Sequence, residues 1–278
     1  INLGTSVLCS QYLGARLHDK VVQVVGVSLL LNVLIGLAVS AALYFGAPFL
    51  LHLMGLRDNL MAYGVSYMEI VGAFAFFQAI SLTISASLKS ADKAIYPMLV
   101  VVVVNVLNII GNYALIFGKF GLPAMGVEGA AISTSFARGV SMVILFVILF
   151  RKHIPSFPMK IFHPFPWGEL KVLLKIGLPS AGEHMSYNFS QVVLTYFINM
   201  LGNEALTART YDVNTVMFVY LFTIAMAQGG AICIGHLVGD KRIRGAYLLG
   251  KYVMRLSVLV AVSLSCVWAL MGKTMFGW

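Results

Sequence analysis

The sequence has 278 residues, of which 60% are hydrophobic and only 10% are charged. Soluble domains carry about 25% charged residues, so this composition excludes a soluble globular domain and indicates a membrane protein. The formal net charge is +9, but no platform of interleaved basic and aromatic residues accompanies it, so no nucleic-acid partner is expected.

Apolar runs long enough to cross a bilayer, which takes roughly 20 residues per helix, recur along the whole chain. The first 13 residues are typical of the tail of one helix, and full spans are expected at residues 21–45, 61–88, 95–117, 129–150, 171–201, 205–237 and 246–271. An apolar patch at 49–55 follows the first full span, and Pro48 is expected to end the regular helix before it. The predicted fold class is all-α, a polytopic transmembrane helical bundle.

The basic residues predict how these spans are oriented. Most of them fall in loops on one side of the membrane: Arg16, Lys20, Lys89, Lys93, Arg151, Lys152, Lys160, Lys171, Lys175, Lys241, Arg242, Arg244, Lys251 and Arg255. The loops on the other side carry only Arg57, Lys119 and Lys273. Because basic loops stay in the cytoplasm, we expect the first group to be cytoplasmic and the protein to be a multi-pass protein of the inner (cytoplasmic) membrane.

A polar, basic segment rich in proline occupies residues 151–170. It is too long and too rich in proline for a tight turn, which favours a cytoplasmic linker between two bundles. The expected domains are an N-terminal lobe at 1–150 and a truncated C-terminal lobe at 171–278.

Two loops resemble each other at a distance of 225 residues: SQYLGARLHDK at 10–20 and IGHLVGDKRIR at 234–244. This shift aligns Gly14 with Gly239 and Arg16 with Lys241. Six spans lie between the copies, so the repeats have the same orientation, as in transporters built from parallel repeats. The hypothesis implies two six-helix halves in a parent of about 450 residues, cut here within its second helix and after its ninth. The alternative is that two unrelated loops share glycine and basic residues.

Polar side chains inside the spans are the candidate site residues, since ionisable groups are costly in hydrocarbon. The span at 171–201 has most of them: one helical face holds His184, Asn188, Gln191, Thr195 and Asn199, with Glu183 and Tyr187 beside it. Pro179 and Gly182 at its start favour a local bend. The alternative is that the amide side chains only form structural hydrogen bonds between helices.

Other spans carry fewer polar groups. Asn105, Asn108 and Asn112 share one face of the span at 95–117, either as a polar wall or as packing. Arg209 and Asp212 are three residues apart, which allows them to neutralise each other. Glu69 is a weaker candidate because the sequence places it near the outer end of its span, and Arg138 has no obvious partner.

The residues contain no enzyme signature. Cys9, Cys233 and Cys266 lie in apolar segments and indicate neither a disulfide framework nor a metal site. The histidines lack metal-ligand spacing and no phosphate-binding glycine loop is present. We therefore expect no enzymatic activity, no metal and no cofactor other than a coupling ion.

The stretch NVLNIIGNYALIFGKFGLPAMGVEGAAISTSFAR at 105–138 resembles the fifth and sixth helices of MATE (multidrug and toxic compound extrusion) transporters. VLCSQYLGARLHDK resembles the end of their second helix, and IGLPS the start of their seventh. The resemblance covers the chain from late helix two to helix nine and is closest to the bacterial norfloxacin-exporter branch.

The resemblance implies export of cationic amphipathic compounds in exchange for H⁺ or Na⁺, by rocking of two six-helix lobes. Some members have Asn followed four positions later by Asp in helix five, where this chain has Asn108 and Asn112. In the norfloxacin-exporter branch an acid follows the helix-seven proline by about two turns. Tyr187 occupies that place here, and Glu183, one turn earlier, is the nearest substitute.

The leading hypothesis is an antiporter, coupled to H⁺ or Na⁺, that exports small cationic organic compounds by alternating access and is monomeric. Its predicted substrate- and ion-binding residues are Glu183, Tyr187, Asn188, Gln191, Asn108, Asn112 and Asp212. The alternative is a lipid-linked oligosaccharide flippase of the related superfamily, which needs more intramembrane cations than Arg138 and Arg209. A receptor or scaffold without transport is a third class, against which the repeat argues.

Overall fold

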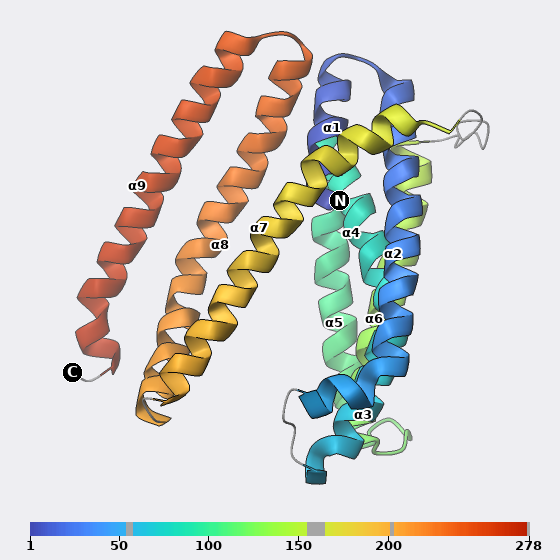
Figure 1. Ribbon diagram of the computed structural model, residues 1–278, viewed down its shortest axis with the longest axis vertical. Helices are drawn as coiled ribbons and strands as arrows, with labels where there is room; N and C mark the ends of the chain where they lie inside the picture. The colour runs from blue at the N-terminus through green and yellow to red at the C-terminus, as the bar shows by residue number, and fades with distance from the viewer. Residues whose placement is uncertain (54–57, 155–164, 201–202, 277–278) are drawn as a thin grey trace. The chain divides into compact units, whose positions relative to one another are not determined.

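The computed structural model describes residues 1–53, 58–154, 165–200 and 203–276, which form helices and no strands. The helices are α1 (Asn2–Gly14), α2 (His18–Leu53), α3 (Asp58–Ala73), α4 (Ala75–Ser90), α5 (Ile95–Phe117), α6 (Gly126–Lys152), α7 (Trp167–Met200), α8 (Asn203–Gly239) and α9 (Ile243–Phe276) (Figure 1). The predicted all-α class is confirmed. Residues 155–164, which are half of the predicted linker at 151–170, lie outside the described residues.

Membrane-crossing length and apolarity are found in α2, α5, α6, α8 and α9, and also in the bent pair formed by α3 and α4. The prediction that Pro48 ends its helix is wrong, because α2 continues through it to Leu53. A proline removes one backbone hydrogen bond, and the neighbouring Ala47 is fully buried against the bundle. Helix α7, with 34 residues, is long enough to cross a bilayer. Its polar stripe makes it less apolar than the helices just named.

The predicted continuous span at 61–88 is broken at Phe74, where α3 and α4 meet at 42°. A break frees backbone groups that hydrocarbon cannot satisfy. The N–H of Phe76 donates to Oγ of Ser40 on α2 at 3.2 Å. Oγ of Ser135 on α6 donates to the carbonyl of Ile70 at 3.4 Å. Two buried serines from neighbouring helices therefore compensate for the break.

The chain divides into two compact units, which we describe separately. Unit 1 comprises Ile1–Cys9 and His18–Leu174, and unit 2 comprises Ser10–Leu17 and Lys175–Trp278. In unit 1, α2 packs against α3 and α4, and α6 packs against α3, α4 and α5. In unit 2, α8 and α9 form an antiparallel pair (Figure 1). The end of α1 packs with unit 2, a division that no sequence pattern indicated.

A buried polar network holds α1, α2 and α4 together inside unit 1. Nδ2 of Asn32 donates to Oγ1 of Thr83 at 2.7 Å and lies 3.4 Å from Oδ1 of Asn2. Oγ1 of Thr83 lies 3.2 Å from the same Asn2 oxygen. A second buried bond, 2.8 Å long, joins Thr5 to Ser28. These groups partner one another, so the network is best explained as structural adhesion between helices.

Asn32→Ala is expected to destabilise the protein by about 1–2 kcal/mol, since polar bonds between membrane helices contribute roughly 0.6–1.7 kcal/mol each. The measurement is thermal unfolding in detergent. Thr83→Val is the partner variant, and the double variant is expected to cost less than the sum of the two single changes. Full additivity would show that the two side chains do not act together.

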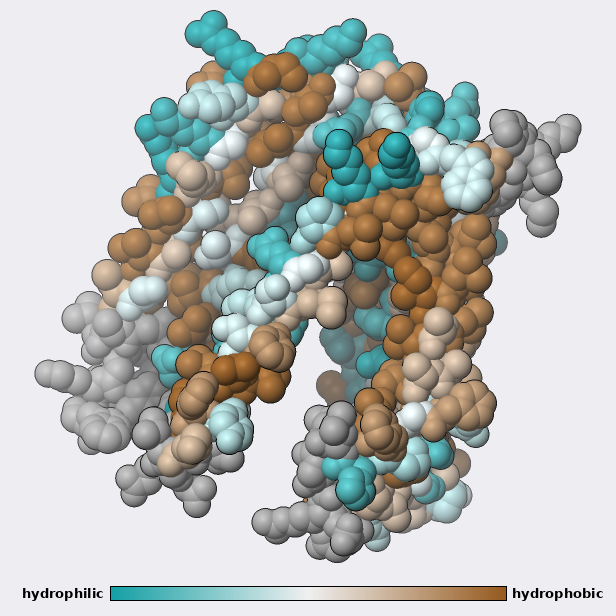
Figure 2. All heavy atoms as spheres, viewed as in Figure 1, coloured by the Kyte–Doolittle hydropathy of each residue, from teal (hydrophilic) through white to brown (hydrophobic). Residues whose placement is uncertain are grey.

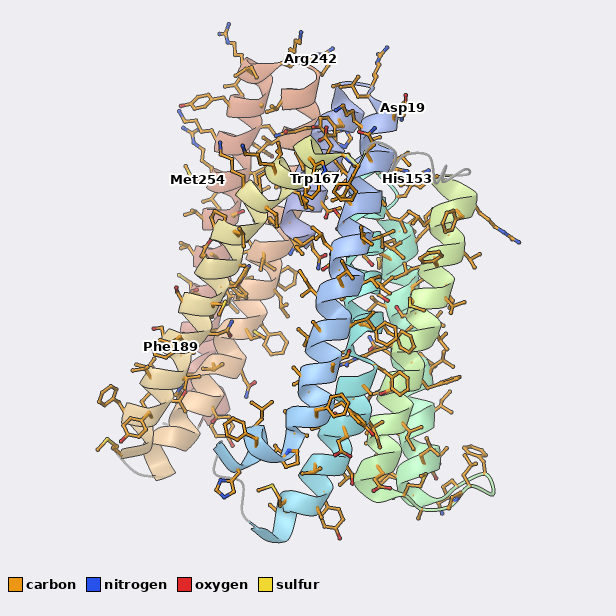
Figure 3. All side chains as sticks on the ribbon, turned by 45° about the vertical axis from the view of Figure 1, so that its right-hand side comes forward. Asp19, His153, Trp167, Phe189, Arg242 and Met254 are labelled. Atoms are coloured by element: carbon orange, nitrogen blue, oxygen red, sulfur yellow. The ribbon has the colours of Figure 1, made fainter. Side chains whose placement is uncertain are left out.

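One end of unit 1 carries an ion pair between the starts of α2 and α7. Nζ of Lys20 lies 2.5 Å from Oε1 of Glu169, and this carboxylate is 7% exposed. Asp19, His153 and Trp167 lie at the same end (Figure 3). Burial, with the positive charges of Lys93 and His18, lowers the pKa of His153 to about 4. The imidazole is therefore neutral near pH 7.

The hydropathy of the surface follows this arrangement. Figure 2 shows hydrophobic residues along the outer surface of α2 and hydrophilic residues around the loop between α8 and α9. Lys241 and Arg242 are exposed in that loop, Arg244 is exposed in the first turn of α9, and Arg242 pairs with Asp240 at 2.8 Å. Apolar helix surfaces with charged loops are what a bilayer requires, so the multi-pass membrane arrangement is supported.

The two repeated loops have the same backbone conformation. Arg16 and Lys241 have φ of 60° and 59°. The N–H of Leu17 donates to the carbonyl of Tyr12 at 2.8 Å, and the N–H of Arg242 donates to that of Leu237 at 2.9 Å. Each loop therefore closes its helix with the same C-terminal cap, at positions related by the predicted shift.

The repeats also touch each other reciprocally within unit 2. A Cβ on Gly14 would overlap the backbone carbonyl of His236, and a Cβ on Gly239 would overlap the carbonyl of Gln11. The shift that maps Gly14 onto Gly239 also maps Gln11 onto His236, so the crossing has local twofold symmetry. This symmetry supports the repeat and argues against two unrelated loops. The glycines serve close packing, because the left-handed residues are Arg16 and Lys241.

Candidate functional site

A polar cluster lies on the seam between α5 and α6 in unit 1. Nδ2 of Asn108 donates to Oγ1 of Thr134 at 3.3 Å. Nδ2 of Asn112 donates to Oδ1 of Asn108 at 3.0 Å. The hydroxyl of Ser133 donates to the backbone carbonyl of Asn108 at 3.2 Å. The structure thus brings the two predicted asparagines together and adds two hydroxyls from the neighbouring helix.

Small residues allow α5 and α6 to approach closely enough for these contacts. A Cβ on Gly111 would overlap Oγ of Ser133, and one on Gly129 would lie 2.7 Å from the backbone carbonyl of Leu115. Without a hydrophobic driving force between them, membrane helices associate through such close backbone contacts. The glycines therefore place the asparagines beside the hydroxyls.

The cluster leaves one acceptor open. Oδ1 of Asn112 is buried, and no donor reaches it from the residues that the structure describes. A buried carbonyl oxygen without a donor carries a desolvation cost. A proton donor or a hard cation, which prefers oxygen ligands, would satisfy this atom. The seam could therefore bind a small cation or a hydrogen-bond donor, although it carries no negative charge.

In unit 2, the predicted residues of α7 lie along one exposed helix. Glu183, Tyr187 and Asn188 are exposed. Nδ2 of Asn188 donates to the carbonyl of His184 in its own helix at 2.8 Å. Helix α7 runs through Pro179 from Trp167 to Met200, with Phe189 along its far part (Figure 3). An exposed carboxylate on this helix can meet a cationic group.

Gln191 connects α7 to α8 through an intramembrane arginine. Nη2 of Arg209 donates to Oε1 of Gln191 at 2.8 Å. No ion pair joins Arg209 to Asp212 among the described residues, and Asp212 is exposed. Arg209 and Asp212 therefore do not neutralise each other as their spacing would allow, because the guanidinium of Arg209 points toward Gln191 on α7. Among the described residues, no hydrogen bond or ion pair joins Asp212 or Glu183 to the Gln191–Arg209 pair.

Sequence reasoning missed Thr134 and Ser133, two hydroxyl residues in the run AAISTS at residues 130–135. Hydroxyls of that kind often bond within their own helix, so the run alone does not predict contacts with another helix. The glycine spacing on α5 and α6 was the available signal, since it predicts which faces of the two helices touch.

The chain is similar to known transporters along its whole length. It is 40% identical over 278 residues to the uncharacterized transporter YisQ of Bacillus subtilis, covering 100% of this chain and 61% of that protein. It is 27% identical over 229 residues to the probable multidrug resistance protein NorM of Thermotoga maritima, covering 81% of this chain and 49% of that protein. The matched region therefore spans 49–61% of the length of these relatives.

The fold matches solved structures as well. A crystal structure of MATE in the bent conformation superposes with a TM-score of 0.89 at 22% identity, covering 98% of this chain and 60% of that one. The family model MatE matches residues 1–114 and 179–277. These ranges include the repeated loops, both seam asparagines and the polar stripe of α7. The chain belongs to the MatE family.

Proposed function

We propose that the protein containing this chain is an antiporter of the cytoplasmic membrane that exports small cationic organic compounds in exchange for H⁺ or Na⁺. Membership of the MatE family and the multidrug resistance names of its relatives support this function. The observation that carries the exchange is the pair of polar sites on membrane helices, one on the α5–α6 seam and one on α7.

The two sites have complementary chemistry. Glu183 is an exposed carboxylate on α7, and no cation pairs with it among the described residues. A carboxylate in an apolar setting attracts either a cationic substrate or a coupling ion, and occupancy by one disfavours the other. This competition is the minimal requirement for exchange. Tyr187 provides an aromatic face one turn away, which suits an organic cation.

The Asn108–Asn112–Thr134 cluster is the second polar site. Its oxygens suit a dehydrated cation or a hydrogen-bond donor, and the open Oδ1 of Asn112 provides an acceptor. Because Asn112 carries no charge, we propose that this cluster binds weakly and lines the transport path. The carboxylate of Glu183 then supplies the main charge, with Asp212 as a second acid and Gln191 and Asn188 as polar lining.

The test is ethidium efflux from cells expressing the full-length protein, compared with cells carrying an empty vector. We expect faster efflux that depends on an imposed pH or Na⁺ gradient. A protonophore and removal of Na⁺ distinguish the two coupling ions. Membrane-inserted protein that causes no efflux of ethidium under either gradient would refute the proposal.

A flippase for lipid-linked sugars is the other outcome of the same experiment. It predicts a cell-envelope defect on deletion and unchanged ethidium efflux. Loss of efflux without an envelope defect supports the exporter.

A further inference from the structure

Arg138 is a charged residue near the middle of a membrane-spanning helix. It lies on α6, whose apolar span runs from Gly126 to Arg151. It is partly buried, and in the described part of the chain no carboxylate lies within ion-pair distance of its guanidinium. Intramembrane arginines without a counter-charge are expensive, so a functional partner is the first explanation to test.

Arg138 lies on the inner side of α6. Ala131 and Leu145, seven residues before and after it, are buried at 0% and 2% exposure. Residues seven apart share a helix face, so the arginine points away from the lipid side. That lipid side is marked by Phe136, Val143 and Val147, which are 66%, 55% and 47% exposed.

The polar seam continues to Arg138. Thr134, the hydrogen-bond partner of Asn108, lies one helical turn before Arg138. The Cβ atoms of Thr134 and Arg138 are therefore about 5–6 Å apart. The antiparallel helices meet at Leu115 with Gly129, Gly111 with Ser133, and Asn108 with Thr134. The next turn of each helix brings Asn105 level with Arg138.

The resulting stripe consists of Asn105, Asn108, Asn112, Thr134 and Arg138. It carries one positive charge and no acid. Glu69, a carboxylate on α3, makes no ion pair with Arg138 among the described residues. The guanidinium of Arg138 lies at one end of this stripe and provides N–H donors for a hydrogen-bond acceptor, whereas the open Oδ1 of Asn112 lies at the other end. A guanidinium binds a carboxylate with two parallel hydrogen bonds.

We propose that Arg138 binds the carboxylate of zwitterionic substrates, with Asn105 and Thr134 as flanking polar groups, and so determines selectivity between substrates with and without that group. The inference rests on the proposed export function and adds Arg138 as a residue that determines which substrates are accepted.

The test uses two dyes that differ in one group. Rhodamine 123 is the methyl ester of rhodamine 110, which has a free carboxylate. Efflux of both dyes is measured from cells expressing the full-length protein or its Arg138→Met variant. We expect the variant to lower the ratio of rhodamine 110 to rhodamine 123 efflux at least tenfold. Arg138→Lys keeps the charge without the two-pronged geometry and is expected to give an intermediate ratio.

The ratio is insensitive to the amount of folded protein, since both dyes report on the same molecules. Arg151→Met, at the exposed end of the same helix, is the matched control and is expected to leave the ratio unchanged. Equal loss of both dyes in Arg138→Met, or an unchanged ratio, would overturn the proposal in favour of a structural arginine. Wild-type protein that exports the ester and not the acid would also overturn it. Export of neither dye and of no ethidium would instead refute the proposed function.

Discussion

Glu183→Gln is expected to reduce ethidium efflux by the full-length protein roughly tenfold or more, which corresponds to the loss of a coupling free energy of at least about 1.4 kcal/mol. Glutamine keeps the shape and hydrogen-bonding capacity of the side chain but removes its charge. Glu183 is exposed on α7, so the change leaves no buried group without a partner. The effect should therefore fall on transport, and protein abundance in the membrane should stay unchanged.

The measurement is the initial rate of dye efflux under an imposed ion gradient, normalised to protein in the membrane. Glu128→Gln is the matched control, since it makes the same chemical change at an exposed position in the first turn of α6. Asp212→Asn is expected to have a smaller effect. Wild-type efflux with unchanged ion dependence in Glu183→Gln would contradict the role of this carboxylate and leave Asp212 as the other proposed acid.

Gly239→Ala is expected to destabilise the protein by about 3 kcal/mol, because a methyl group at this position overlaps the backbone of Gln11. Backbone atoms cannot rotate out of the way as a side chain can, so α1 and α8 must separate. The apparent melting temperature in detergent should fall by roughly 5–10 °C. Gly14→Ala, at the equivalent position of the repeat, is expected to have an effect of similar size.

Gly229→Ala is the control within the same helix. No heavy atom lies within 4 Å of a Cβ placed there, so the substitution is expected to stabilise α8 by about 0.5–1 kcal/mol through helix propensity. The two alanine variants should therefore shift the melting temperature in opposite directions. Equal shifts would show that propensity, and not the crossing of α1 with α8, determines the stability at Gly239.

The sequence alone predicted the helical class and the approximate spans, since a bilayer demands long apolar runs whatever their tertiary contacts. It could not predict the break at Phe74. Hydropathy is continuous through Ala73 and Ala75, and the break depends on Ser40 and Ser135, which lie far away in the chain. The continuation of α2 through Pro48 could not be predicted for the same reason, because packing against neighbouring helices outweighed the local tendency of proline to end a helix.

Site residues divide in the same way. The spacing of Asn108 and Asn112 placed them on one helical face, and the structure shows that they bond each other and Thr134. The spacing of Arg209 and Asp212 also suggested a partnership, yet Arg209 bonds Gln191 on another helix. Helical periodicity identifies which residues share a face, but it does not say which face meets which helix.

The repeated loops show where sequence and tertiary structure meet. The sequence by itself determined the shift between the two copies and their common orientation, because both follow from aligned residues and a count of apolar spans. Only the tertiary structure decided that Gly14 and Gly239 pack reciprocally on the backbones of His236 and Gln11. The reason is physical: a glycine in a sequence reports only that a side chain is absent, whereas what fills that space depends on a helix more than 200 residues away in the chain.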